Sequence, residues 1–330
     1  LRIVETLARK EPDNVQLQRD VAVALDRLGD VCMQSGRPAE ALAQFEAGMV
    51  LGRKIAAQDP ANSTAQFDLS AGLAKLGDAC LALDRMDDAL ASFQEALENT
   101  RQLATADPDN TEVQRTLSVL LAKVGSAQLL TGQHGPATQS FTATIDIAQR
   151  LAESDVHNVQ AQRDVAVGWH RLMLAHQQTG NLDGWRAASQ RTIEGFERVH
   201  EATSGAAASV QDLTRVLAQC CEGLGVFSAP SAADLQVALA RARQLVTLSR
   251  GENPGYLETL AHLQFRTGDG PGAIASLEQA LQHLPDNPDD PDAAATRQRL
   301  AAELEACRTS LPAPSSSPTD SATQKESQSP

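Results

Sequence analysis

The chain has 330 residues, of which 28 are basic and 42 acidic, and its net charge at pH 7 is −14. This negative charge repels phosphate backbones and anionic lipid headgroups, so we expect neither nucleic acid nor a membrane among its partners. Only 3% of the residues are aromatic, so aliphatic side chains must form the core, which favours closely packed helices over sheets.

The first predicted element is residues 1–10, which align with residues 49–58 further along the chain. That later segment has the pattern of the second helix of a hairpin. Residues 1–10 are therefore predicted to be the second helix of a truncated repeat. Because the chain also lacks an initial methionine, we expect it to be a fragment of a longer protein.

A sequence period of 48 residues extends over residues 11–202. A turn-forming stretch that begins at Glu11 returns at Asp59, at Asp107 and, in weaker form, at Asp155. Further columns with the same step are Leu28, Leu76, Val124 and Leu172; Gly29, Gly77 and Gly125; Phe45, Phe93 and Phe141; and Leu7, Ile55, Leu103 and Leu151. Such agreement predicts four structural repeats.

Within each period the apolar residues recur at helical spacing, and two breaks divide the period into arms of about 20 residues. The first break contains Gly36 in the first repeat. The second is an Asp-Pro-x-Asn stretch, where proline ends one helix and asparagine can cap the next. Each repeat is therefore predicted to be a helical hairpin, and because one hairpin cannot bury its own apolar face, stacked hairpins predict a solenoid.

The spacing of large, small and aromatic residues resembles the tetratricopeptide repeat (TPR). In the second repeat the residues that carry the resemblance are Leu73, Leu76, Gly77, Cys80, Ala89, Phe93 and Ala96. The step of 48 residues exceeds the usual length of about 34, as in the arrays of large bacterial signalling proteins. The resemblance implies an all-α fold, a right-handed α-solenoid of about six stacked antiparallel hairpins with a C-terminal capping helix.

The later repeats depart from this pattern. The fourth has bulky residues such as Trp169, Met173 and Trp185, together with Ser189, so we expect its hairpin crossing to be looser or rotated. The remaining predicted segments are a degenerate repeat at 203–251, a final TPR-like repeat at 252–285, a capping helix at 292–310 and a disordered tail rich in Ser and Pro at 311–330.

The sequence offers no set of residues with catalytic, cofactor-binding or metal-binding spacing. We therefore expect the fragment not to be an enzyme, and to use no cofactor, no metal and no small-molecule substrate. The glycine-rich stretch 268–272 lacks the Lys and Ser or Thr of a phosphate loop and predicts a turn. An odd number of scattered cysteines favours a cytoplasmic location, and a redox role of the adjacent Cys220 and Cys221 stays open.

One basic residue recurs in every repeat on the first helix. This basic column consists of Arg27, Lys75, Lys123 and Arg171. It could form a charge ladder for an extended acidic partner. The favoured interpretation is a row of ion pairs with acidic residues such as Asp26, Asp30 and Asp78, because a charge row is usually a solvated face.

The TPR resemblance implies that the first helices line a concave groove that binds a protein partner. The predicted groove residues are Val23, Asp26, Asp30, Met33, Ala71, Ala74, Asp78, Leu81, Val119, Ala122, Ser126, Leu129, Val167, His170, Leu174 and Gln177. This groove is apolar with a few acids at one end, which suits a helix or an extended peptide with a basic end.

Two sets of residues on the same helices are expected to differ in burial. The set expected to face solvent in the groove is Met33, Leu81 and Leu129. The set expected to be buried between the hairpin arms is Leu28, Leu76 and Val124.

The most direct functional interpretation is a protein–protein interaction scaffold that binds a peptide or helix of a partner protein. The alternative is the C-terminal regulatory or sensor region of a larger bacterial signalling enzyme, either a serine/threonine protein kinase or a signal-transducing ATPase. In such families, similar long-period arrays follow the catalytic domain. The sequence upstream of Leu1 would separate the two interpretations.

Overall fold

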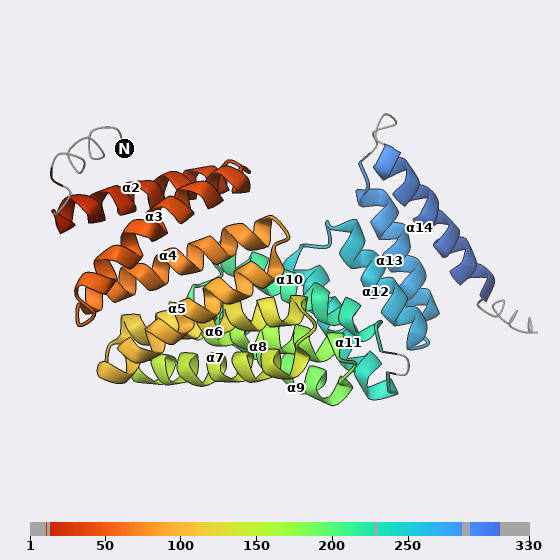
Figure 1. Ribbon diagram of the computed structural model, residues 1–330. Coiled ribbons are helices and arrows are strands. Elements are labelled where there is room, and N and C mark those ends of the chain that lie inside the picture. Colours follow the sequence, from red (N-terminus) through yellow and green to blue (C-terminus); the bar gives the residue numbers. More distant parts are fainter. Residues whose placement is uncertain (1–10, 12–13, 228–229, 286–290, 311–330) are drawn as a thin grey trace, which may run out of the picture. The chain divides into compact units, whose positions relative to one another are not determined.

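The computed structural model describes residues 11, 14–227, 230–285 and 291–310 (Figure 1). The described residues form thirteen helices and no strand, which confirms the predicted all-α fold. The chain divides into two compact units, Leu1–Val216 and Leu217–Pro330, and the division falls inside helix α10 (Ala207–Leu224). The predicted helix at residues 1–10 and the predicted tail at 311–330 lie outside the described residues.

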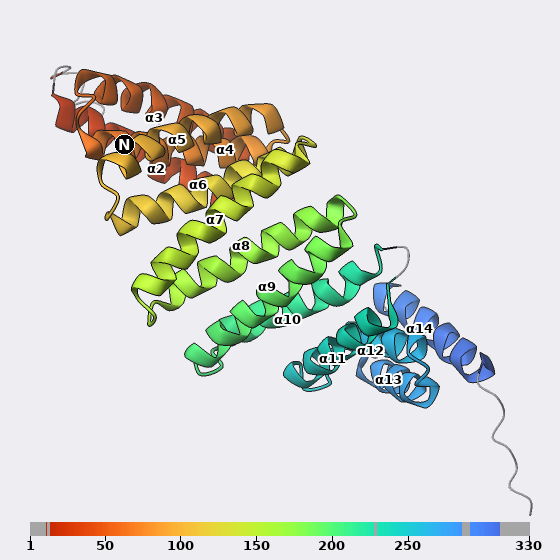
Figure 2. The same ribbon diagram turned by 90° about the horizontal axis from the view of Figure 1, so that it is seen from below.

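Unit 1 contains four helical hairpins of nearly equal length. The pairs are α2 (Val15–Gln34) with α3 (Pro38–Gln58), α4 (Ser63–Ala82) with α5 (Met86–Ala106), α6 (Thr111–Leu130) with α7 (His134–Ser154), and α8 (Val159–Gln178) with α9 (Leu182–Ala202). In both views the two helices of a hairpin lie side by side (Figure 1 and Figure 2). Each helix begins 48 residues after its equivalent, so the sequence period and the structural period coincide.

Each first helix begins with an asparagine cap. The side chains of Asn14, Asn62, Asn110 and Asn158 each accept a hydrogen bond from the backbone N–H three residues later, at 3.0–3.2 Å. These bonds satisfy an N–H group that has no partner inside the helix. The cap therefore fixes the same starting point for the first helix in all four hairpins.

In the first three hairpins, the two arms cross where a glycine meets a phenylalanine. The pairs are Gly29 with Phe45, Gly77 with Phe93, and Gly125 with Phe141. A Cβ atom on any of these glycines would lie 2.3–2.7 Å from a ring atom of its phenylalanine, so any larger residue would force the arms apart. The three rings are buried, and they fill the space between the arms.

The fourth hairpin reverses the positions of the small and the large residue. Met173 stands in the glycine column and Ser189 in the phenylalanine column, and both side chains are fully buried. Trp185, which replaces an alanine, is also buried. The expectation of a looser crossing is therefore wrong, because the methionine of α8 supplies the volume that α9 loses at the serine, and the alternative of a rotated crossing stays a prediction.

Unit 2 contains the end of α10 and four further helices. These helices are α11 (Ala232–Leu248), α12 (Pro254–Arg266), α13 (Gly270–His283) and α14 (Pro291–Ser310). Helices α12 and α13 form a shorter hairpin, and α14 packs against α13 in the place predicted for the capping helix. Its side chains Leu300 and Leu304 join a buried cluster with Leu257 and Leu277.

Among the described helices, none combines the length and the apolar content that crossing a lipid bilayer requires.

The size exchange in the fourth hairpin predicts a rescue by double substitution in the second. Gly77→Met alone should destabilise the protein by about 1–3 kcal/mol through overpacking, and Phe93→Ser alone by about 3–5 kcal/mol through a cavity. Together they should cost less than the sum by more than about 1 kcal/mol, because the methionine fills the space that the ring leaves. Urea unfolding followed by circular dichroism measures these free energies.

The control variant is Gly135→Ala in α7, because a Cβ atom there would meet nothing within 4 Å. This variant should unfold like the parent protein or slightly later. Strictly additive costs for Gly77→Met and Phe93→Ser would show that the two positions do not share one packing space.

Candidate binding surface on the first helices

The predicted groove residues lie on helices α2, α4, α6 and α8, and we call the surface that they form the first-helix face. Most of the groove residues are half-buried there. Val23 and Val119 are exposed, whereas Ala122 is only 2% exposed. Ala122 is covered by its neighbours and offers no contact to a partner, so its assignment to the groove is wrong. The other groove assignments stay predictions.

The apolar residues of the first-helix face differ in how far they reach solvent. Met33 and Leu81 pack against the buried core of the hairpins, so the expectation that they simply face solvent is wrong in part. Among the predicted groove residues, the exposed large apolar side chains are Val23 of α2, which is 41% exposed, and Val119 of α6, which is 40% exposed. Elsewhere on these two helices, Val15, Val31 and Leu130 are also exposed. A partner would meet Val23 and Val119 before it met the deeper groove residues.

The column expected between the hairpin arms is not uniformly buried. Val124 is buried and Leu76 packs against the core, but Leu28 is 38% exposed, so the prediction for Leu28 is wrong. Helix α2 is the first helix that the structure describes, and no described hairpin precedes it to cover Leu28. The burial of this column thus depends on the neighbouring repeat.

Two members of the basic column form ion pairs with acids of the preceding repeat. Lys75 Nζ lies 2.8 Å from Asp30 Oδ2 and 3.6 Å from Asp26 Oδ2, and Lys123 Nζ lies 2.5 Å from Asp78 Oδ1. Burial raises the pKa of Asp26, while Lys75 opposes the rise. The acids that were expected to receive a basic peptide end are therefore already paired within the chain.

Each of these lysines also lies over an aromatic ring of the preceding hairpin. Lys75 Nζ is 6.0 Å from the ring centroid of Phe45, and Lys123 Nζ is 5.4 Å from that of Phe93. The attraction between an ammonium group and a ring face adds to the ion pair. The phenylalanine that fills the space between two arms thus also interacts with the lysine of the next repeat.

A second row of ion pairs, which we call the arginine row, joins the N-terminal halves of successive first helices. The pairs are Arg19 with Asp68 at 2.7 Å, Arg115 with Asp164 at 2.9 Å, and Arg163 with Asp212 at 2.8 Å. The pair that the 48-residue step predicts between α4 and α6 is absent. Phe67 stands at the position of the arginine and Thr116 at that of the aspartate, so both partners are replaced together. The sequence analysis missed this row, although partners 49 residues apart in two periodic columns could have revealed it.

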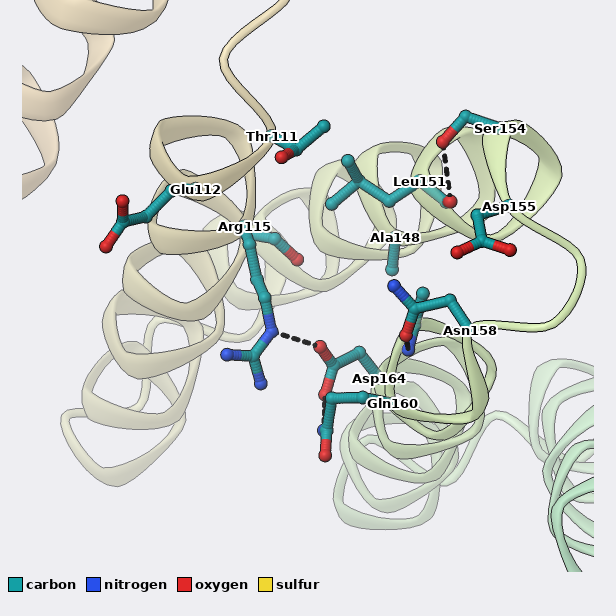
Figure 3. A pocket seen from close by; sticks show the side chains of 12 residues that line it. Thr111, Glu112, Arg115, Ala148, Leu151, Ser154, Asp155, Asn158, Gln160 and Asp164 are labelled. Carbon is teal, nitrogen blue, oxygen red and sulfur yellow. Dashed lines mark hydrogen bonds and ion pairs between the residues drawn. The ribbon is translucent and has the colours of Figure 1, made fainter.

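Two hollows open beside the arginine row, at equivalent positions two repeats apart. The larger, of about 430 Å³, lies between α6 and α8 with α7 behind it, and Figure 3 shows Arg115 reaching across it to Asp164. The smaller, of about 100 Å³, has Arg19 and Asp68 in the corresponding places. Leu151 in the larger hollow corresponds to Ile55 in the smaller, so each offers an apolar wall beside an ion pair.

Several polar groups of the larger hollow are engaged with one another. Asp164 accepts hydrogen bonds from Arg115 and from the Gln160 side chain, and Asn158 caps α8. Such a hollow is large enough to accommodate a side chain of a partner.

Unit 2 contains a cluster whose ligand atoms are close enough together to consider a metal ion. Carboxylate and imidazole atoms of Glu258, His262 and Glu303 lie within 4.8 Å of one another. However, the guanidinium group of Arg299 donates hydrogen bonds to both carboxylates, and His262 lies 3.0 Å from Glu303. Arg299 therefore offsets part of the negative charge of the two carboxylates, and its bonds to Glu258 and Glu303 link α14 to α12.

The adjacent Cys220 and Cys221 of α10 are both buried. Burial raises the pKa of the Cys220 thiol to about 11 and that of the Cys221 thiol to about 12, although nearby Arg241 opposes the rise. A thiol that stays protonated at neutral pH is a poor nucleophile.

Repeated hairpins of this length, with a small residue and a large one at every crossing, define a TPR-like fold, and the comparisons with solved structures confirm it. The sequence matches no family model and no curated protein. Similar structures include BtubC from P. vanneervenii, with a TM-score of 0.53 and 16% identity over 86% of this chain and 97% of that chain.

Two further similar structures have comparable scores. A signal transduction ATPase with numerous domains (STAND) from Pyrococcus horikoshii, which has a tetratricopeptide repeat sensor, has a TM-score of 0.55 and 13% identity, over 92% of this chain and 46% of that chain. Nro1, described as a hypoxic regulator of sterol synthesis and a nuclear import adaptor, has a TM-score of 0.50 and 11% identity, over 90% of this chain and 99% of that chain. At these identities the likeness concerns the fold alone.

The raised pKa values predict that Cys220 and Cys221 are unreactive in the folded protein. At about pH 8 a thiol with so high a pKa carries too little thiolate, so alkylation by iodoacetamide should be at least about a hundredfold slower than in urea. Mass spectrometry of timed samples measures both rates, with the half-buried Cys307 as the internal reference. A reversible Cys220–Cys221 disulfide under mild oxidation would contradict this prediction.

Proposed function

We propose that the chain is a non-catalytic protein-interaction scaffold that binds a peptide or helix of a partner protein on the first-helix face. The observation that carries this proposal is the exposure of Val23 and Val119 on a face whose charges are largely paired within the chain. Internal pairing lowers the cost of covering charged groups, and exposed apolar side chains gain from burial against a partner.

The exposed valines belong to a stripe that runs between the basic column and the arginine row. In α6, Val119 stands four residues after Arg115 and four residues before Lys123, so all three lie on one side of the helix. The equivalent positions form the stripe Val23, Ala71, Val119 and Val167. An amphipathic helix or an extended peptide laid across the first helices would contact this stripe and the hollows beside it.

The names of two similar structures support a binding role without identifying the partner. Nro1 is described as a nuclear import adaptor, and the STAND protein as having a tetratricopeptide repeat sensor. On this proposal the chain acts in the cytoplasm, where its free cysteines stay reduced.

A second candidate is a regulatory or sensor region of a larger bacterial signalling protein, such as a serine/threonine protein kinase or a signal-transducing ATPase. The similarity to the STAND protein favours it, because this chain spans 46% of the length of that one. The two candidates are compatible, since a sensor of this fold would also act by binding a partner.

Peptide selection tests the binding face. We expect a displayed library of random peptides of about 12 residues, which span about 40 Å when extended, to yield binders of the purified chain. The double substitution Val23→Glu with Val119→Glu should weaken these binders by about tenfold or more, because it places unpaired charges in the apolar contact. Fluorescence polarisation with labelled peptides measures the Kd values.

The matched control is Leu25→Glu with Leu121→Glu, on the same two helices but with both leucines buried. This pair should unfold the hairpins, because it buries charges without partners, whereas the valine pair should leave the helical circular dichroism signal unchanged. Undiminished binding by a folded valine variant would place the binding surface elsewhere.

We also propose that the chain has no nucleotide-dependent activity. Stretch 268–272, which contains several glycines, spans the end of the turn after α12 and the first residues of α13, and it follows a helix, whereas a phosphate loop follows a strand. Isothermal titration with ATP and Mg²⁺ should give no heat of binding, and a micromolar Kd would reveal a nucleotide site.

A further inference from the structure

Arg171 is the member of the basic column whose acidic partner is missing. Lys75 pairs with Asp30 and Lys123 with Asp78, in each case 45 residues earlier in the chain. The corresponding position for Arg171 is Ser126, whose hydroxyl donates a hydrogen bond to the carbonyl oxygen of Ala122. Ala122 in turn stands in the column of Asp26, the second acid that Lys75 reaches.

No described carboxylate lies within ion-pair distance of Arg171. The acid that acts on it electrostatically is Asp164, two helical turns earlier, and that carboxylate is paired with Arg115 and Gln160. Burial lowers the pKa of Arg171, but a guanidinium group stays charged at neutral pH. Arg27, at the other end of the column, is instead exposed and can be fully hydrated.

A half-buried cation without an acidic partner is unfavourable in the free protein, and it gains when a partner supplies a carboxylate. The neighbours of Arg171 on the same side of α8 are Val167 and Leu174, both half-buried. They would shield such a pair from water and strengthen it. An arginine in this setting is a frequent centre of binding energy in protein interfaces.

We propose that Arg171 binds the side-chain carboxylate of an aspartate or glutamate in the partner segment, in the place that Asp30 and Asp78 hold for the lysines of the earlier repeats. This inference rests on the proposed binding of a peptide to the first-helix face, and it specifies the peptide as one with an acidic residue flanked by apolar ones. The preferred carboxylate is a side chain because the acids that fill this place elsewhere in the column are aspartate side chains.

The test uses peptides selected on the intact chain and four versions of the protein. These versions are the parent, Arg171→Gln, Ser126→Asp and Ser126→Asn. The aspartate variant supplies the missing acid from within the chain, whereas the asparagine variant has nearly the same shape without the charge. For each version, Kd is measured with a selected peptide and with the same peptide carrying Gln in place of its acid.

We expect the selected peptides to share Asp or Glu at one fixed position. Replacing that acid should weaken binding to the parent by about tenfold or more, but should change binding to Arg171→Gln very little. Ser126→Asp should bind the acidic peptide about tenfold more weakly than Ser126→Asn does, because the two side chains share a shape and differ in charge, while the melting temperature of Ser126→Asp is equal to or above that of the parent. Because Ser126→Asp retains Arg171, its result does not depend on whether the Arg171→Gln variant folds.

The inference is overturned if the acid of the peptide contributes as much on Arg171→Gln as on the parent, or if Ser126→Asp binds as tightly as Ser126→Asn. Binders that lack a fixed acid but still lose affinity on the Val23 and Val119 substitutions would overturn this inference and leave the proposed function standing. A library that yields no binder at all would count against the proposed function, and the role of Arg171 would fall with it.

Discussion

The close approach of the two arms in each hairpin is the constraint on which the rest of unit 1 depends. In three hairpins a glycine admits the ring of a phenylalanine, and in the fourth a buried methionine and a buried serine stand at the equivalent positions. What is preserved is the summed volume at the crossing, and not the identity of either residue. Because the crossings are alike, the first helices follow one another at a constant step, and side chains in equivalent positions meet the same surroundings.

This constant step is what allows rows of ion pairs to form between repeats. Each pair is half-exposed and individually worth no more than about 1 kcal/mol. Their larger effect is on the charge of the first-helix face, where Lys75 and Lys123 neutralise acids of the preceding repeat. The stripe that contains Val23 and Val119 therefore lies between two rows of ion pairs, the basic column and the arginine row. Arg171 departs from this scheme, and the departure distinguishes the fourth repeat from the earlier ones.

The repeats and hairpins could be predicted because their signals are local: the asparagine caps lie within three residues of the N–H groups that they satisfy. The tight crossing of the fourth hairpin could not, because Met173 and Ser189 compensate each other from different helices. The exposure of Leu28 and the burial of Ala122 depend on the side chains that cover them. A comparison of residues 48 positions apart does not identify those side chains. The placement of the binding face on the first helices stays a hypothesis. The sequence pattern assigned Val23 and Val119 to the groove but could not give their exposure, and the arginine row was overlooked although both of its columns are visible in the sequence.

The joint replacement of Arg and Asp by Phe67 and Thr116 has a consequence for the order of the repeats. Removing residues 63–110, one full period, would place Arg19 against Thr116 and leave the arginine without its acid. Removing residues 111–158 instead would set Phe67 against Asp164, while Arg171 would receive Asp78. The four hairpins share one backbone plan, yet they are not interchangeable, because deleting one repeat changes which ion pairs can form between its neighbours.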